Sequence, residues 1–298
     1  MGTWLADEVT TAGFTIIGVD LRAPLRPQIW ANFSTSSLET VDLIQLLAGY
    51  NVTSVLHLAG GASVPASTKD PYGDFSSLVP GTARLALYLA QVQPQARLFM
   101  FSSAAVYGNA LILPISETTP ILPISPYGVH KATAETLLSH YARIYGLNVT
   151  IFRLFSVYGP GLRKQLIWDV CQRAITAHGN KQKSITLFGT GLESRDFIYV
   201  KDICKAVLTV ISNSADEQIE TYNLASGNES TVKEITQCLI RHLQMDVQIM
   251  FNGVVPKGDP VNWRADTNRL KKLNFICDYN LNDGLGHVVK WIKTLGNL

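Results

Sequence analysis

The sequence predicts an α/β protein: a doubly wound parallel sheet followed by a smaller C-terminal lobe. In the first half, short apolar runs alternate with longer segments of helical periodicity. This alternation is typical of parallel strands joined by right-handed helical crossovers. After Pro160 the alternation breaks, which indicates a second unit.

The first half supplies most of the sheet. Ligands of such sheets bind beyond the carboxyl ends of the strands, where the sequence places Asp20, Ala59, Ser103 and Phe155. These four residues are therefore expected to border one shared site. The predicted strands cover residues 15–19, 54–58, 98–101 and 148–154, the predicted helices 2–12, 37–49, 76–91 and 126–145, and a loop rich in Gly, Ser and Pro covers 60–73.

The second half is predicted to return once to the sheet. Its expected helices are 164–178, 202–212 and 231–243, and its expected strands 185–188, 194–200, 220–224 and 248–251. The sheet-bearing domain is thus predicted to comprise residues 1–155 and about 196–224. The smaller lobe would comprise about 156–195 and 225–298.

Composition excludes several classes of protein. The chain has 298 residues, 47% hydrophobic and 16% charged, with a net charge of +2 and no basic run, so nothing favours nucleic acid. Its four cysteines lack metal-ligand spacing and are expected to be buried, reduced thiols, with no metal bound. No apolar run reaches transmembrane length and no signal peptide is evident, so a cytoplasmic protein without membrane contact is expected.

The most informative motif is Tyr127-Gly128-Val129-His130-Lys131, at the start of a predicted helix. Residues four apart on a helix share a face, so Tyr127 and Lys131 are expected to point into one site. A nearby cation favours phenolate and lowers a tyrosine pKa from about 10 toward neutrality. Tyr127 is therefore a candidate general acid/base. His130 and His57 have no metal-ligand company and are expected to be structural.

Ser102 and Ser103 directly follow the predicted strand 98–101, which precedes this helix. They could cap a turn, or a hydroxyl could hydrogen-bond both a substrate oxygen and Tyr127. The presence of Tyr127 and Lys131 favours the second interpretation.

With these motifs, the chain resembles the extended short-chain dehydrogenase/reductase family, in its NAD-dependent nucleotide-sugar epimerase/dehydratase branch. The resemblance runs from Gly2 to about Trp291 and includes UDP-glucose 4-epimerase-like members. It implies a Rossmann-type sheet, a catalytic triad of Ser103, Tyr127 and Lys131, tightly held NAD, and a C-terminal lobe that binds the nucleotide-diphosphate sugar. The markers stand in family order: residues 2–5, 19–20, 57–60, 102–108, 127–131, 153–160, 194–197 and 258–259.

The resemblance also implies the cofactor residues. Asp20 stands at the distance after Gly2 expected for the carboxylate that binds an adenosine ribose and favours NAD over NADP; the alternative is a turn residue. Asn32 stands where an Asp commonly contacts adenine. The predicted cofactor residues are Gly2, Asp20, Asn32, Ala59, Gly60, Tyr127, Lys131 and Phe155.

The phosphate loop departs from the family. Gly2 matches the last glycine of G-x-x-G-x-x-G, while the first strand and the earlier glycines are not present. A hole in the sheet is therefore expected. An upstream start, a truncation or a decayed family member would each explain it.

On the substrate side, Arg195 matches the family arginine that grips the nucleotide diphosphate, a role suited to its forked guanidinium. A surface ion pair is the alternative. Ser156 stands where many epimerases carry Asn. Asp259 ends a segment that aligns with R-x-G-D, in which Pro256 replaces the arginine. The predicted substrate residues are Ser103, Ser156, Arg195 and Asp259.

The residues after Ser103 decide the expected reaction. Family dehydratases place Asp-Glu there to eliminate water, whereas this chain has Ala104 and Ala105. The leading hypothesis is therefore NAD-dependent 4-epimerisation of a UDP-hexose or similar nucleotide sugar, for polysaccharide biosynthesis, by a homodimer joined through residues 76–91 and 131–145. A nucleotide-sugar 4-ketoreductase and a non-catalytic sugar-nucleotide binder are the alternatives.

Overall fold

The computed structural model describes residues 1–61, 63–213, 217–254 and 262–296. The chain divides into two compact units. Unit 1 comprises residues 1–109, 117–154 and 207–223, and unit 2 comprises 110–116, 155–206 and 224–298. This division differs from the predicted one at residues 110–116, 155, 196–206 and 224, which were predicted in the sheet-bearing domain and cluster with unit 2. Residues 196–199 belong to β8, which pairs only with strands of unit 2 among the described residues.

The main sheet of unit 1 has the strand order β3-β4-β5-β9. β3 (Ser54–His57), β4 (Arg97–Ser103) and β5 (Asn148–Leu154) pair in parallel, and β9 (Ile219–Leu224) adds the predicted returning strand. The side chains of β4 and β5 are almost all buried. The α/β class and the parallel sheet predicted from the alternating pattern are therefore confirmed.

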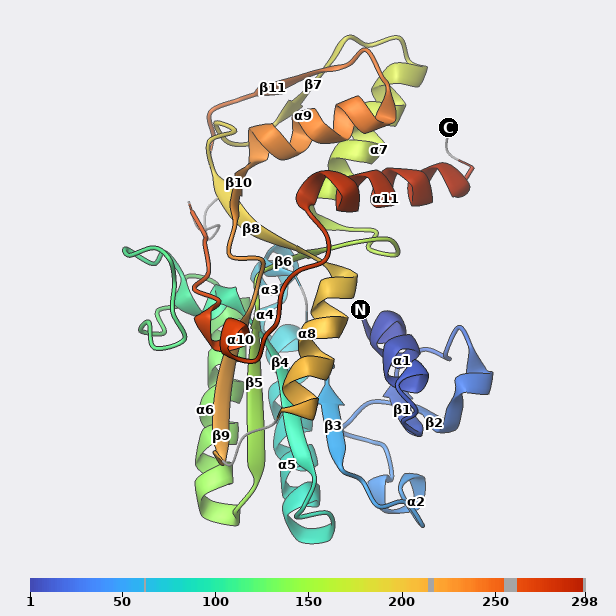
Figure 1. Cartoon of the computed structure of the whole chain (residues 1–298), viewed down its shortest axis with the longest axis vertical. Helices are drawn as coiled ribbons and strands as arrows, with labels where there is room; N and C mark the ends of the chain where they lie inside the picture. Colours follow the sequence, from blue (N-terminus) through green and yellow to red (C-terminus); the bar gives the residue numbers. More distant parts are fainter. Residues whose placement is uncertain (62, 214–216, 255–261, 297–298) are drawn as a thin grey trace. The chain divides into compact units, whose positions relative to one another are not determined.

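A second, two-stranded sheet stands apart in unit 1 (Figure 1). β1 (Ile16–Asp20) pairs in parallel with β2 (Trp30–Thr35), which was not predicted. Among the described residues, β1 and β3 each end their sheet with no strand on the outer side. Ile17 and Val19 nonetheless pack on the same apolar core as Val55. The expected hole in the sheet is thus present.

Helices α5 (Val79–Val92) and α6 (Pro126–Tyr145) pack on this core through buried residues such as Leu85, Leu89 and Leu138. α1 (Gly2–Thr11) and the 3-10 helix η1 (Pro27–Ile29) adjoin β1 and β2. The predicted helix over 37–49 is wrong apart from a single turn, α2 (Leu43–Leu46). Asp42 caps that turn by accepting from Gln45 N, so the helix begins late.

The predicted loop over 60–73 is also wrong in part, because it contains two short helices. α3 (Val64–Lys69) begins at the Ser63 cap, and α4 (Pro71–Ser76) begins at the Asp70 cap. Each has a proline in its first turn, where a missing N–H costs nothing. The prolines and serine that contributed to the loop prediction therefore mark helix starts instead.

Unit 2 is built on a three-stranded sheet of order β10-β8-β6, comprising β10 (Glu229–Thr231), β8 (Ser194–Tyr199) and β6 (Ser156–Tyr158). β7 (Ser184–Leu187) pairs in parallel with β11 (Gln248–Phe251). The helices are α7 (Gln165–Gly179), α8 (Val200–Ser212), α9 (Val232–Leu243), α10 (Asn268–Lys272) and α11 (Leu281–Thr294), with α8 ending in unit 1.

The cysteines are free thiols; Cys171, Cys204 and Cys238 are buried, whereas Cys277 is partly exposed, contrary to expectation. Within the described ranges, no cluster of three His, Cys, Asp or Glu side chains is placed to hold a metal ion. None of the helices in the same ranges is both long and apolar enough to span a membrane.

Candidate active site

Tyr127 and Lys131 lie one turn apart at the start of α6. Ser125 caps the helix by accepting from Gly128 N at 3.2 Å, and Pro126 fills the first helical position. Lys131 Nζ lies 5.9 Å from the centre of the Tyr127 ring and donates to Phe101 O at 2.9 Å. The ammonium is therefore tethered to β4 while its charge stays near the phenol.

Ser103 is the last residue of β4. Its hydroxyl accepts from Ala105 N at 3.2 Å, capping the 3-10 helix η2 (Ala104–Tyr107). The same side chain is hydrogen-bonded to Tyr127. The two interpretations of this serine are thus compatible, because it caps a turn and contacts the phenol. Unit 1 brings Ser103, Tyr127 and Lys131 together, and their catalytic roles stay predictions.

Close backbone packing fixes this geometry. A Cβ on Gly128 would lie 2.5 Å from Ala105 O and 2.9 Å from Pro123 Cβ, so only glycine fits. The first turn of α6 therefore rests directly on η2, which follows Ser103. A larger residue at position 128 would push Tyr127 away from Ser103.

The pKa of Tyr127 shifts opposite to the sequence-based expectation. Burial raises the pKa above 10.0, the hydrogen bond with Ser103 lowers it, and the charge of Asp74 raises it. Burial is the largest cause, because removing a phenolate from water is costly. Burial also lowers the pKa of Lys131 to about 8, although Asp74 and Glu135 favour the ammonium form. Tyr127 is therefore a protonated acid at neutral pH.

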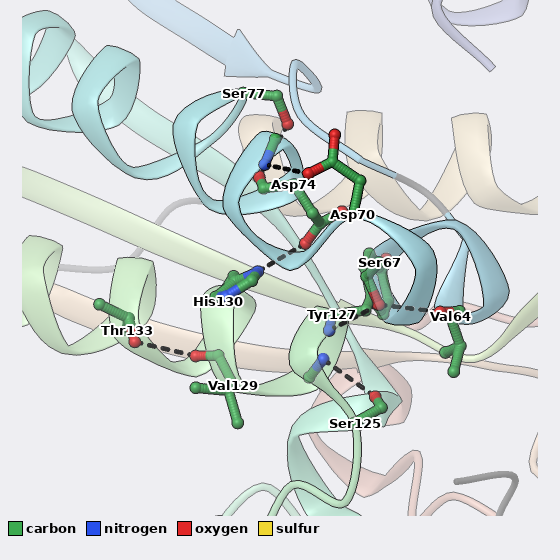
Figure 2. Close-up of polar contacts among 12 residues, drawn as sticks. Val64, Ser67, Asp70, Asp74, Ser77, Ser125, Tyr127, Val129, His130 and Thr133 are labelled. Atoms are coloured by element: carbon green, nitrogen blue, oxygen red, sulfur yellow. Dashed lines mark hydrogen bonds and ion pairs between the residues drawn. The ribbon is translucent and has the colours of Figure 1, made fainter. Parts of the chain in front are cut away.

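The N-terminal turn of α6 is held from the other side by α3 and α4 (Figure 2). Ser67 Oγ accepts from Tyr127 N at 3.0 Å and donates to Val64 O at 2.8 Å. His130 Nδ1 lies 2.6 Å from Asp74 Oδ2. His130, expected to be structural from the sequence, thus joins two helices beside the motif.

Beneath the motif lies a buried polar network that the sequence did not reveal. Glu135, eight residues after Tyr127 on the same helix, accepts from Ser102 Oγ and pairs with Arg153 at 2.7 Å. Arg153 also donates to Tyr107 Oη at 3.0 Å, which donates to Asn223 Oδ1 at 2.6 Å. The spacing of Tyr127, Lys131 and Glu135 at four-residue steps is the signal that could have predicted it.

His57 is structural in its contacts. It ends β3, is buried, and its Nε2 lies 2.8 Å from Thr82 Oγ1. Burial, assisted by the charge of Lys131, lowers its pKa to about 3. The ring is therefore neutral at physiological pH.

The predicted cofactor residues of unit 1 vary in their surroundings. Gly2 begins α1, whose Met1 cap offers no side-chain hydrogen bond to the first turn. Asp20 ends β1, is 56% exposed, and accepts from Arg22 N at 2.9 Å. Asn32 donates to Leu46 O and accepts from Phe33 N, so its amide ties β2 to α2.

Ala59 and Gly60 follow β3 and are exposed. Gly60 has φ +116°, and a Cβ there would lie 2.9 Å from Leu78 Cδ1. This backbone conformation and the lack of space both require glycine. The turn after β3 is thus tightly folded against the start of α5.

Unit 2 holds the remaining predicted residues. The Arg195 guanidinium lies 5.5 Å from the Trp263 ring centre, and Arg195 Nη1 donates to Ser194 O at 2.7 Å. Phe155 packs edge-on to the same Trp263, with centroids 6.0 Å apart. Ser156 begins β6 and is partly buried. Asp259 lies outside the described residues.

Asp196, beside Arg195, is fully buried and was not predicted as a site residue. It accepts from the backbone N–H groups of Ser226 at 2.8 Å, Gly227 at 2.9 Å and Ala265 at 3.1 Å. One carboxylate thus fixes two loops against the strand that carries Arg195.

The fold and this site define an NAD-dependent enzyme of the extended short-chain dehydrogenase/reductase class. Known proteins are similar in both sequence and structure. A match to the family described as "NAD dependent epimerase/dehydratase family" covers residues 1–225. The chain belongs to this family, whose characterised relatives are nucleotide-sugar epimerases, that is, isomerases.

Individual relatives agree with this assignment. The chain is 29% identical over 272 residues to a putative UDP-glucose 4-epimerase of Methanocaldococcus jannaschii, covering 88% of this chain and 84% of the relative. It is 30% identical to the uncharacterized UDP-glucose epimerase YtcB of Bacillus subtilis, covering 91% and 83%. The solved structure of MoeE5 with UDP-glucose and NAD superposes with a TM-score of 0.86 at 27% identity, covering 99% and 95%.

Proposed function

We propose that the protein catalyses NAD-dependent epimerisation at C4 of a nucleotide-diphosphate hexose, most simply a UDP-hexose. One observation carries this proposal: Tyr127 is hydrogen-bonded to Ser103, with Lys131 beside it and only the buried Ala104 and Ala105 after Ser103. A carboxylic acid at those positions would be needed for elimination of water. The residues present suit proton transfer at a single hydroxyl.

The side chains around the cofactor fit NAD in part. The exposed Asp20 carboxylate at the end of β1 suits a ribose hydroxyl, and the N-terminus of α1 at Gly2 suits a phosphate. Ala59 and Gly60 offer exposed backbone, and Lys131 and Tyr127 would lie at the nicotinamide end. The Asn32 amide is already engaged by Leu46 and Phe33. NAD, when bound, would accept and return the hydride.

Tyr127 would exchange a proton with the sugar 4-hydroxyl. Its raised pKa makes the phenolate a strong base once formed, and the hydrogen bond from Ser103 stabilises that phenolate. Lys131 adds positive charge at neutral pH. Because its pKa is lowered to about 8, it begins to lose this charge slightly above neutral pH. Ser103 would also orient the sugar oxygen.

In unit 2, Arg195 is the proposed diphosphate ligand. Its guanidinium, supported by the Trp263 ring, offers a fork of donors that matches phosphate geometry. Ser156 would contribute a short hydroxyl to the sugar or phosphate, and Asp259 is proposed as a further substrate residue from the family resemblance alone.

The test is turnover of a panel: UDP-glucose, UDP-glucuronic acid and UDP-N-acetylglucosamine, with the C4 epimer of each measured by NMR. Tyr127→Phe should reduce the rate by about two to four orders of magnitude, because one general acid/base is lost. Tyr72→Phe, on an exposed tyrosine of α4, is the matched control and should retain the wild-type rate. Wild-type turnover in Tyr127→Phe would refute the catalytic assignment.

A non-catalytic sugar-nucleotide binder is the second candidate, and the split sheet of unit 1 favours it, since β1 and β3 both present an open edge. Calorimetry with each UDP-sugar separates the two. Binding without any turnover, in protein saturated with added NAD, would support the binder and contradict the epimerase.

A further inference from the structure

The hairpin formed by α3 and α4 covers the first turn of α6, where Tyr127 lies. The first amides of a helix have no partner within the helix. Ser125 satisfies one of them, at Gly128, and the fully buried Ser67 satisfies another, at Tyr127 itself. The backbone of Tyr127 is thus held by a residue sixty positions earlier in the chain.

The second link between these helices is charged. His130 Nδ1 lies 2.6 Å from Asp74 Oδ2, and the two side chains are only 12% and 8% exposed. Phe75 packs edge-on against the imidazole, with centroids 5.6 Å apart. Figure 2 shows His130 on the side of α6 that faces α4, three residues after Tyr127 and adjacent to Lys131. Residues three apart are neighbours on a helix surface.

The second oxygen of Asp74 lies against the turn that follows β3. A Cβ on Gly61 would lie 1.9 Å from Asp74 Oδ1, so a side chain at this position would collide with the carboxylate. The turn therefore lies directly against Asp74. The neighbouring Asp70 carboxylate has a different partner: it accepts from Gly73 N at 2.9 Å and caps α4. Asp74 is therefore enclosed between α4, α6 and the turn, with His130 as its partner across the interface.

Asp74 is also the charge that acts on both members of the motif. Its negative charge disfavours the Tyr127 phenolate and favours the Lys131 ammonium, whereas Glu135 acts only on Lys131 of these two residues. When the His130 Nδ1 atom carries a proton, its N–H donates to the Asp74 carboxylate and compensates part of that negative charge.

We propose that His130 is a positioning residue that pins and compensates the Asp74 carboxylate, so that the Tyr127 hydroxyl can lose its proton during catalysis. The proposal deepens the function proposed above and rests on it, since it assumes that Tyr127 transfers the proton. It assigns a role to the two central residues of the contact between α4 and α6.

Two substitutions that break the same pair should then act in opposite directions. Asp74→Asn removes the negative charge and favours the phenolate. His130→Phe keeps an aromatic ring beside Phe75 but has no N–H to donate, so it leaves the Asp74 carboxylate in place without its partner and disfavours the phenolate. A purely structural contact would give the same direction in both variants, because both loosen α4 from α6.

The experiment is a difference titration that needs no turnover. The phenolate absorbance of each protein is followed against pH and corrected with the same background carrying Tyr127→Phe. We expect the Tyr127 midpoint to move down in Asp74→Asn and up in His130→Phe, each by ~1 pH unit. The acid limb of kcat/KM for the best UDP-sugar should move in the same two directions.

Two controls separate charge from packing. His140→Gln changes an exposed histidine of α6 and should leave the Tyr127 midpoint unchanged. Ser67→Ala removes the contact with Tyr127 N without altering charge, so it should lower the melting temperature and leave the midpoint in place. His130→Phe keeps the Asp74 charge and tests the sign even where Asp74→Asn fails to fold.

Shifts in the same direction, or no shift in His130→Phe, would overturn the proposal. Opposite shifts of the midpoint in a protein that turns over none of the UDP-sugars would uphold the charge compensation and refute the epimerase. Opposite shifts of the midpoint with an unmoved kcat/KM limb would show that Tyr127 is not the proton carrier, and would overturn the proposal.

Discussion

The carboxylate of Glu135 and the guanidinium of Arg153 form a buried ion pair in unit 1, with Oε2 2.7 Å from Nη2. Arg153 Nε adds hydrogen bonds of 3.2 and 3.1 Å to the two carboxylate oxygens. The side chains are 3% and 7% exposed. The pair joins α6, which carries Tyr127 and Lys131, to β5 of the central sheet.

Breaking this pair from one side should be strongly destabilising. Glu135→Gln leaves the Arg153 charge buried without its counter-ion, and such single removals cost about 3–5 kcal/mol. Urea unfolding measures the free energy of unfolding. Asp169→Asn is the matched control, because the Asp169 to Arg173 pair is exposed and such pairs contribute about 0–1 kcal/mol. Equal effects of the two substitutions would contradict the account of the buried pair.

The elements that the sequence predicted well are those with strong local signals. α6 spans the predicted residues 126–145, because Ser125 caps it, Pro126 starts it and Gly146 ends it in the left-handed region with φ +73°. β5 also matches its predicted range, residues 148–154, as a continuous buried run. The motif residues Ser103, Tyr127 and Lys131 could be placed for the same reason.

Other features depend on contacts between distant segments and could not be predicted. The pairing of His130 with Asp74 joins residues 56 apart, and the contact of Tyr107 with Asn223 joins residues 116 apart. The direction of the Tyr127 pKa shift was also missed, because the spacing shows a nearby cation but shows neither the burial of the phenol nor the charge of Asp74. Helix α2 is shorter than predicted because a polar cap, Asp42, overrode the apolar periodicity.

The lowered pKa of Lys131 predicts a pH dependence of stability. At neutral pH the Lys131 ammonium is desolvated in the folded state but hydrated in the unfolded chain, so its charge destabilises the folded state. Between pH 8 and 10.5 the unfolded state binds more protons than the folded state, so this residue's contribution to stability rises with pH in that window. Below about pH 8 the full penalty applies.

Lys131→Met removes this titration while keeping a long side chain. The difference in free energy of unfolding between wild type and Lys131→Met should change by up to about 3 kcal/mol across the window, in favour of the wild type at higher pH. Urea unfolding at pH 7 to 10 measures it. The tyrosines titrate in both proteins, so their contribution cancels in the difference between the two free energies of unfolding. A pH-independent difference would refute the burial of a titrating ammonium.

Arg195 is predicted to contribute affinity for the diphosphate. Arg195→Ala should weaken binding of UDP by about 1.5–3 kcal/mol, because charge-assisted hydrogen bonds are lost. Arg195→Lys should restore only part of this, since an ammonium keeps the charge without the fork or the stacking on Trp263. Calorimetry with UDP is the measurement, and Arg241→Ala, on the exposed side of α9, is the control. Unchanged UDP binding in Arg195→Ala would remove Arg195 from the site.

The outer face of α6 predicts self-association. A groove of about 480 Å³ on this face is lined by Pro123, Val129, Ala132, Thr133, Thr136 and Leu137. Val129 is 45% exposed, and Ile144 further along the helix is 66% exposed. A helix that is apolar on a second face has a second partner, and the family resemblance implies another copy of α5 and α6.

Val129→Glu should therefore convert a dimer to a monomer, because a charge would be buried in the contact. Light scattering at micromolar concentration measures the mass. Ile44→Glu changes another exposed apolar residue, 69% exposed on α2, and should leave the dimer intact. A wild-type monomer at this concentration would exclude the predicted homodimer.

The open edges of β1 and β3 predict that a further strand would stabilise unit 1 and its cofactor site. Both edges leave backbone groups without a strand partner within the described residues, and such edges readily accept an extended segment. A variant in which an apolar strand and a G-x-x-G-x-x turn precede Gly2 should retain NAD more tightly, because the turn brings backbone amides to the pyrophosphate. Cofactor content after gel filtration and the melting temperature are measured in both proteins.

At a hundredfold excess of NAD over Kd the bound cofactor alone adds about 2.7 kcal/mol to the free energy of unfolding. A Gly/Ser extension of equal length is the control and should change neither quantity. Stoichiometric NAD in the chain without the added strand would show that the residues already described suffice to hold the cofactor.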